Sequence, residues 1–331
     1  MARGLARGFG RGRETAGEAR GRAEARGLGA AARPPGVPAP LFIITCMRSY
    51  SSLVCGMLGQ HPDLFGLPEV NLATADRVSA LLGLLQTLRP ASLHGLYRTI
   101  AELEFGAQTD ETIALAREWV AERRDWTTAE MFRHIASTVA PRAIVEKSPS
   151  SVAFMRHLDR LIDAFPDARF LHLTRHPRPT CKSIHALVSA TDAKKGTNRA
   201  DQTDPERLWT KMNANAFEFI DRLPVGQGMR IRGEDLLTYP DTYLGQICAW
   251  LGIRFDAEAL EAMKHPETSP FARIGPESAR FGNDPNYLNH PEFTQRPIPP
   301  SELDGPMEWT ETGAEGFSLQ TRTLAQALGY R

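Results

Sequence analysis

Arginine and serine side chains gather in two short segments of the sequence. The first, residues 45–53, reads TCMRSYSSL, and the second, residues 175–183, reads RHPRPTCKS. Arginine supplies a fixed positive charge and serine supplies a hydroxyl donor, and together these groups suit a phosphate or a sulfate. Arg175 and Ser183 stand eight residues apart and can converge on one such group. We therefore expect an anionic ligand at both segments.

The elements around the first segment place it at the start of a helix. LFIIT, at residues 41–45, is a short apolar and β-branched run that is typical of a buried strand, and SSLVCGMLGQ, at 51–60, has helical spacing. A loop that opens a helix presents free backbone N–H groups and the positive end of the helix dipole to an anion. The side chains that add donors here are Arg48, Ser49, Ser51 and Ser52.

The first segment lacks the signatures of two other phosphate-binding loops. A Walker A loop requires G-x-x-x-x-G-K-[ST], which is absent, and this argues against a P-loop kinase. A cysteine phosphatase loop would need an arginine six residues after Cys46, where the sequence has Ser52. The histidines of the chain fit no standard zinc-ligand spacing, so we expect no metal.

Short apolar runs alternate with helical patterns along most of the chain. After LFIIT, the runs that indicate strands lie at residues 141–146, 168–174 and 229–232. This alternation predicts an α/β fold with a central, mostly parallel sheet flanked by helices. Ligands of such sheets collect at the carboxyl ends of the strands, which is where both arginine–serine segments fall.

The chain divides into a tail and one domain. Residues 1–40 are rich in Arg, Gly, Ala and Pro, carry a net charge of +5 and are predicted to be disordered, whereas residues 41–331 form the folded domain. Within the domain, residues 72–140 are predicted to be a helical insertion on the acceptor side of the site. The polar residues 189–206 are predicted to be a mobile loop.

The composition limits the classes of partner and compartment. The 39 basic and 39 acidic side chains balance, which indicates no nucleic-acid partner. Four cysteines without C-x-x-C spacing predict no disulfide framework and a reducing compartment. No apolar run approaches the roughly 18 residues needed to span a bilayer, and the first residues have no secretory pattern. We expect a cytoplasmic protein that is monomeric or homodimeric.

The ordered set of motifs resembles the sulfotransferases that use 3′-phosphoadenosine-5′-phosphosulfate (PAPS) as donor. That family binds the 5′-phosphosulfate with a P-[RK]-S-G-[ST]-[ST]-L loop, which MRSYSSL matches at 47–53. It binds the 3′-phosphate with R-x-P-R and a serine eight residues after the first arginine, which residues 175–183 match. Other blocks of its tyrosylprotein and polyketide-synthase branches resemble GMLGQHPDLFGLPEVNL (56–72), VEKSPS (145–150), IRGEDLLTYPDTYLGQICAWLGI (231–253) and GNDPNYLNHPEF (282–293).

The resemblance implies a P-loop-like three-layer sandwich and a role for each matched residue. Arg48 would neutralise charge on the leaving 3′,5′-diphosphate and Lys147 charge on the sulfuryl oxygens, while Glu69 would act as general base. Donor-binding residues would be Arg48, Ser49, Tyr50, Ser51, Ser52, Arg175, Ser183 and Arg232. The reaction needs no metal. The acceptor carries a hydroxyl and belongs to one of the family's classes: small molecules, glycans, tyrosyl peptides, lipids or carrier-bound acyl chains.

The sequence departs from the family pattern at three positions near the expected donor site, of which one is Met47 in place of the usual Pro. Tyr50 stands where the family has Gly, and Gly233 stands where an aromatic residue often occurs. Glycine reaches backbone angles that tyrosine resists, so either a regular helix begins here or the donor sits differently. Tyr50 could also contact a ligand itself. The alternative function is a catalytically inactive anion-binding relative, and His290 is an additional, less supported site residue.

Overall fold

A computed structural model describes residues 35–197, 202–307, 309 and 316–331. Most of the tail predicted to be disordered therefore lies outside the described residues, as do residues 198–201 of the predicted mobile loop. Every helix within the described ranges is too short or too polar to cross a membrane.

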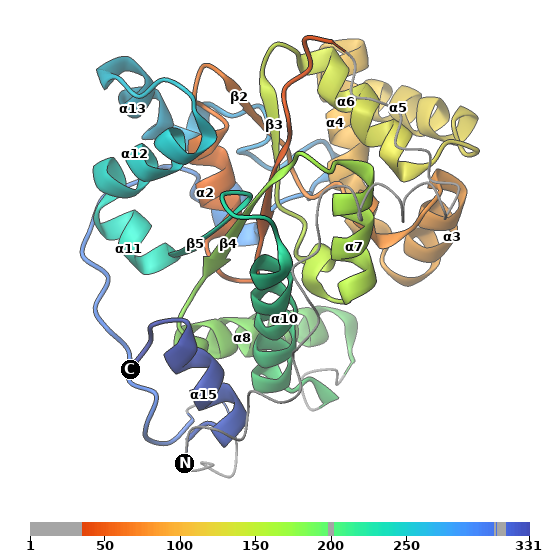
Figure 1. Cartoon of the computed structure of the whole chain (residues 1–331). Coiled ribbons are helices and arrows are strands. Elements are labelled where there is room, and N and C mark those ends of the chain that lie inside the picture. Colours follow the sequence, from red (N-terminus) through yellow and green to blue (C-terminus); the bar gives the residue numbers. More distant parts are fainter. Residues whose placement is uncertain (1–34, 198–201, 308, 310–315) are drawn as a thin grey trace.

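Five parallel strands form one central sheet (Figure 1). They are β1 (Leu41–Ile44), β2 (Leu64–Gly66), β3 (Ala143–Glu146), β4 (Arg169–Thr174) and β5 (Gly228–Arg232), in the order β2-β3-β1-β4-β5. The expected parallel α/β sheet is thus confirmed, with one strand more than the sequence indicated. The sequence analysis missed β2 because its three residues, LFG, are too short to show a period.

The central strand β1 is buried on both faces, and its alternate residues belong to different cores. Leu41 and Ile43 pack in one apolar cluster, whereas Phe42 and Ile44 pack in the other. Since successive side chains of a strand point to opposite faces, the two clusters lie on opposite sides of the sheet. The predicted three-layer arrangement is therefore confirmed.

The two faces of the sheet are covered by different helices (Figure 1). On the Leu41 face lie α2 (Ser51–Leu58), α11 (Gly233–Thr238), α12 (Pro240–Leu251) and α13 (Ala257–Met263). On the Phe42 face lie α3 (Val78–Leu88), α4 (His94–Phe105), α5 (Asp110–Glu122), α6 (Thr128–Val139), α7 (Met155–Ala164), α8 (Pro177–Lys195), α10 (Pro205–Arg222) and α15 (Leu319–Ala327).

One segment has boundaries that differ from the expected ones, and another has little regular structure. Helix α8 continues to Lys195, where Gly196 in a left-handed conformation ends it, so helix covers part of the 189–206 segment. Residues 264–307 run along the sheet edge with little regular structure and include only one α-helix, α14 (Pro285–Asn289). This irregular segment, which we call the C-terminal segment, reaches the carboxyl ends of the strands.

Candidate active site

The loop between β1 and α2 has an unusual backbone. Arg48 and Tyr50 both have φ of 65°, in the left-handed region that favours glycine. Tyr50 thus adopts a conformation that is typical of glycine, and α2 begins only at Ser51. No side chain caps α2, so its first N–H groups remain available to a ligand. Strained loops of this kind cluster at ligand sites.

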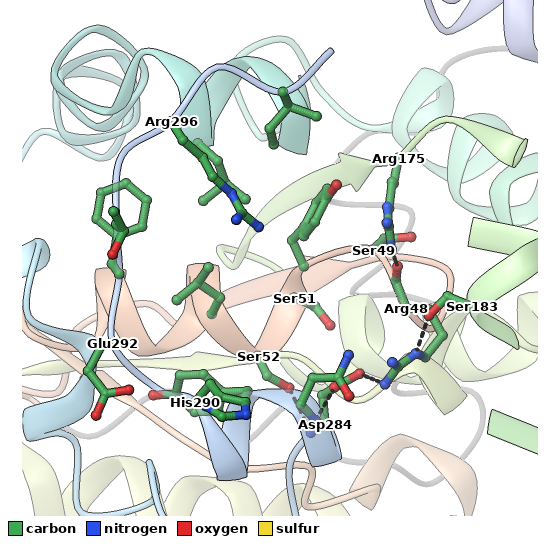
Figure 2. A pocket seen from close by; sticks show the side chains of 18 of the residues that line it. Arg48, Ser49, Ser51, Ser52, Arg175, Ser183, Asp284, His290, Glu292 and Arg296 are labelled. Carbon is green, nitrogen blue, oxygen red and sulfur yellow. Dashed lines mark hydrogen bonds and ion pairs between the residues drawn. The ribbon is translucent and has the colours of Figure 1, made fainter. Parts of the chain in front are cut away.

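Arg48, within this loop, contacts side chains from two distant parts of the sequence, Ser183 and Asp284 (Figure 2). Its Nε donates to Ser183 Oγ at 2.9 Å, and its Nη1 forms an ion pair with the carboxylate of Asp284. The Arg48 side chain is 9% exposed and that of Asp284 is 24% exposed, so water screens this pair only in part. The sequence motifs containing Arg48 and Ser183 therefore meet as expected, and Asp284 is an additional member that they did not indicate.

Lys147 connects the first segment with Glu69. Its Nζ donates to Ser52 Oγ at 2.7 Å and to Glu69 Oε1 at 2.8 Å. The Lys147 side chain is fully buried, while Glu69 is 31% exposed. A buried ammonium requires a counter-charge and hydrogen-bond acceptors, and these two partners supply them. Glu69 therefore points its carboxylate into the same cluster as the α2 N-terminus.

The backbone around Glu69 is held from two sides. Glu69 N donates to Gly282 O at 2.6 Å, and Gly95 of α4 approaches so closely that a Cβ there would collide with Glu69 O. Asn71, with φ of 55°, donates from its N to Ser148 Oγ at 2.9 Å. These contacts fix the Glu69 segment against the Lys147 segment. The sequence analysis missed Gly95, which belongs to no chemical motif, and did not single out Asn71 within the 56–72 block.

Glu146 lies behind Lys147 but is bonded to another partner. Its Oε1 accepts from Ser148 N at 2.8 Å and from Ser148 Oγ. Burial raises the pKa of Glu146 to about 7, because an apolar surrounding disfavours the charged form. Glu146 therefore holds the turn after β3, which carries Lys147.

Arg175 lies at the end of β4 with its guanidinium fixed by neutral groups. Its Nη1 donates to Arg48 O at 2.7 Å, and its Cζ lies 4.3 Å from the centroid of the Tyr50 ring. Trp209 Nε1 donates to Arg175 O at 2.9 Å and holds the main chain. Within the described ranges, Arg175 Nε and Ser49 Oγ are buried without a hydrogen-bond partner. Buried donors of this kind need an acceptor, and an anionic ligand would supply one.

A cavity of 740 Å³ lies beside these side chains. Its walls come from the loop and first turn at residues 48–53 and from residues 284–299 of the C-terminal segment. Figure 2 shows Arg296 extending into it from this segment, opposite Arg175 and the loop. Of the described residues that line it, none belongs to the 72–140 insertion. Asp284 and Arg296 are site residues that the sequence analysis did not single out as binding groups.

Arg232 lies apart from the Arg48 cluster. Its Nε bonds Asp235 Oδ2 at 2.6 Å and its Nη1 donates to Gly329 O at 2.7 Å. It lines a second cavity of 720 Å³, which shares Tyr50 and Arg175 with the first. The structure therefore places Arg232 on the far side of Tyr50 from Arg48.

Glu234 links this second cavity to the carboxyl end of β4. It accepts from His176 N at 2.8 Å and from Tyr330 OH at 3.1 Å, and burial raises its pKa. The R-G-E-D segment therefore connects the loop after β4 to the residues that follow the last helix, α15. Within the described ranges, this set included, no group of three or more His, Cys, Asp or Glu side chains could hold a metal ion.

Together these contacts form one continuous chain of hydrogen bonds. It begins at Glu69 and runs through Lys147 to Ser52. Ser52 Oγ accepts from the main-chain N of Asp284 at 3.0 Å. The Asp284 carboxylate then pairs with Arg48, which donates to Ser183. The arrangement gathers two arginines, a lysine and a helix N-terminus, which are groups suited to binding an anion, with a carboxylate alongside.

Comparisons with known proteins agree with this chemistry. The family model described as "Sulfotransferase family" matches residues 40–257. The solved sulfotransferase domain from the Synechococcus PCC 7002 olefin synthase is similar over 91% of this chain and 98% of its own, with 24% identity and a TM-score of 0.69. The sulfotransferase domain from the curacin biosynthetic pathway is similar over 89% and 98%, with 23% identity and a TM-score of 0.68. None of the curated proteins compared matches the sequence.

Proposed function

Because the chain belongs to the sulfotransferase family, we propose that it transfers the sulfuryl group of PAPS to a hydroxyl acceptor. The observation that carries this proposal is the hydrogen-bond chain from Glu69 to Ser183, which joins a carboxylate, Lys147 and Arg48 at the start of α2. Sulfuryl transfer passes a group in line between two oxygens, so the protein has to position both partners and neutralise charge. The cluster supplies both requirements.

The β1–α2 loop is the proposed site of the donor's 5′ end. The free N–H groups at the start of α2, together with Ser49, Ser51 and Ser52, bind the 5′-phosphate. Arg48 stabilises the oxygen on which charge develops as the sulfur–oxygen bond breaks. Its planar guanidinium carries several donors, so one face can bind the ligand while Ser183 fixes its orientation.

Glu69 is the proposed general base. A hydroxyl acceptor loses its proton as its oxygen bonds to sulfur, and a carboxylate within hydrogen-bond reach can take that proton. The Glu69 side chain is partly exposed and hydrogen-bonded through one oxygen to buried Lys147, so its position is fixed. In this proposal, Lys147 lies between Glu69 and Ser52 to neutralise the sulfuryl oxygens.

Arg175 and Ser183 are the proposed partners of the 3′-phosphate. The unpartnered Nε of Arg175 supports this role, because it is a buried donor that lines the cavity. Arg232 lies across Tyr50, where it contributes to the second cavity rather than to the Arg48 cluster. The proposed acceptor carries a hydroxyl and is a small molecule, a glycan, a tyrosyl peptide, a lipid or a carrier-bound acyl chain.

Thermal unfolding with ligands tests the donor assignment. We expect 3′,5′-diphosphoadenosine to raise the melting temperature, because a ligand that binds only the folded state stabilises it. ATP at the same concentration should have a smaller effect. Arg175→Ala should abolish the shift, and Arg280→Ala, which changes an exposed arginine paired with Glu277, should leave it unchanged. Stabilisation by ATP with none by the diphosphate would overturn the proposal.

Turnover is a separate measurement. Incubation with sulfur-labelled PAPS and representatives of each acceptor class should transfer label to at least one of them. Tight binding of the diphosphate without transfer to any acceptor would instead indicate the inactive anion-binding relative.

A further inference from the structure

Tyr50 occupies the boundary between the two cavities. Both cavities are lined by Tyr50, Arg175, Ile298 and Pro299, so these residues form a partition. Tyr50 is a non-glycine residue with φ of 65°, a conformation that the backbone adopts at an energetic cost. A strained residue at such a boundary requires compensating contacts, and the structure shows two of them.

The first contact of Tyr50 is with Gly233, at the start of α11. A Cβ at position 233 would lie 2.7 Å from Tyr50 Cδ2 and 3.2 Å from Thr174 O. No real side chain tolerates the shorter of these distances without movement. The Tyr50 ring therefore occupies space that is free only because residue 233 is glycine.

The second contact of Tyr50 is with Arg175. The guanidinium lies 4.3 Å from the ring centroid, within the range of a cation–π interaction. The Arg48 carbonyl holds Nη1 of the same guanidinium. In the described part of the chain, no carboxylate forms an ion pair with Arg175. The buried Glu234 carboxylate interacts with this charge electrostatically, so the Tyr50 ring and the Arg48 carbonyl are the direct contacts that position the guanidinium.

We propose that Tyr50 and Gly233 form a coupled positioning pair that makes the site selective for ligands with a 3′-phosphate. The Tyr50 ring orients Arg175, and Gly233 provides the space for the ring. This inference rests on the proposed function, in which Arg175 contacts the 3′-phosphate. It assigns Tyr50 an action through Arg175 rather than direct contact with the reacting atoms.

The test compares two ligands that differ only in the 3′-phosphate. Calorimetry gives the Kd of 3′,5′-diphosphoadenosine and of adenosine 5′-phosphate for each variant. Tyr50→Leu should weaken the diphosphate about tenfold, the size expected for loss of a partly desolvated cation–π contact, and leave adenosine 5′-phosphate unchanged. Tyr50→Phe keeps the ring and should retain the selectivity. An equal loss for both ligands, or no loss for either, would refute the inference.

Gly233 supplies the second arm of the test. Gly233→Ala should displace the ring, lower the melting temperature and reduce the selectivity. The double variant Tyr50→Gly with Gly233→Ala removes the collision, so it should recover melting temperature but not selectivity. If the double variant is no more stable than Gly233→Ala alone, the two positions are not coupled and the inference is wrong.

Arg175→Ala separates failure of this inference from failure of the proposed function. If Arg175→Ala loses selectivity and Tyr50→Leu does not, only the positioning role of Tyr50 is refuted. If Arg175→Ala itself keeps the selectivity, the proposed 3′-phosphate site is wrong and the inference falls with it. Combining Tyr50→Leu with Arg175→Ala should weaken the diphosphate no further than Arg175→Ala alone, because both changes remove one interaction.

Discussion

The ion pair between Arg48 and Asp284 predicts that removing one negative charge will tighten ligand binding. Asp284→Asn neutralises the carboxylate that pairs with Arg48, while asparagine can still accept from Asn286 N as the cap of α14. The change therefore alters charge with little change in shape. In the proposed function, Arg48 must bind the 5′ end of the donor next to this carboxylate.

The magnitude follows from the contact geometry. Two anionic groups that contact one guanidinium lie roughly 4 to 6 Å apart, and unit charges at that separation repel by about 3 to 4 kcal/mol at an effective dielectric constant of about 20. Loss of the partner that pre-orients Arg48 offsets roughly 1 to 2 kcal/mol of this gain. We expect a net gain of about 2 kcal/mol, or roughly 30-fold tighter binding of 3′,5′-diphosphoadenosine.

Calorimetry at two salt concentrations measures the effect. The gain should shrink at high salt, because Asp284 is partly exposed and its field is screened. Asp256→Asn is the matched control: Asp256 caps α13 and pairs with Arg254 at 3.1 Å, but it lines neither cavity. Weaker binding by Asp284→Asn, with Asp256→Asn unchanged, would show that the carboxylate assists the ligand and would refute this reasoning.

Three further predictions concern the Glu69 and Glu146 environments. Glu69→Gln should lower kcat by about 100-fold or more, while calorimetry should show that the diphosphate binds at least as tightly, because the amide oxygen can still accept from Lys147 and the competing negative charge is gone; unchanged turnover would exclude a general base at this position. Because burial raises the pKa of Glu146, the folded state keeps a proton that the unfolded state releases between pH 4.5 and about 7. The free energy of unfolding should therefore fall over this pH range, by up to roughly 3 kcal/mol. Glu146→Gln should flatten that decrease in urea unfolding at pH 5 and pH 8, and an unaltered slope would contradict the assignment. Gly95→Ala should destabilise the fold by about 1 to 3 kcal/mol and lower kcat, because the added Cβ displaces Glu69. Gly83→Ala in α3 adds a Cβ that contacts no other atom, so it should stabilise the fold slightly in the same urea titration. Equal effects of the two alanines would refute the packing argument.

The sequence predicted those parts of the site that follow from a parallel sheet. In such a sheet the carboxyl ends of the strands share one edge, so side chains placed directly after β1 and β4 must lie near one another. Arg48 and Arg175 are 127 residues apart, and this rule brings their two segments together, whereas the hydrogen bond from Arg48 to Ser183 within α8 was not predicted. The same reasoning accounts for the α/β class and for the start of α2.

The remaining contacts of the site depend on tertiary packing, which produces no periodic pattern in the sequence. Asp284 is 236 residues from Arg48 and belongs to a segment with little regular structure, so no repeat of apolar residues places it. The left-handed backbone of Tyr50 was also unpredictable, since propensity favours glycine there. Only the space at Gly233, which is a tertiary property, explains how the ring fits.

The charge pairing of the site suggests how binding free energy is divided along the proposed donor. Arg48 is paired with Asp284, and Lys147 with Glu69, so a ligand at the 5′ end must compete with internal carboxylates. Arg175 is held by a ring and a carbonyl, and the nearby Glu234 carboxylate acts on it without forming an ion pair, so its charge meets weaker competition than that of Arg48. Affinity for the ground state should therefore come mainly from the 3′ end. Arg48 and Lys147 can then act most strongly when charge shifts during transfer, which is the condition under which binding accelerates a reaction.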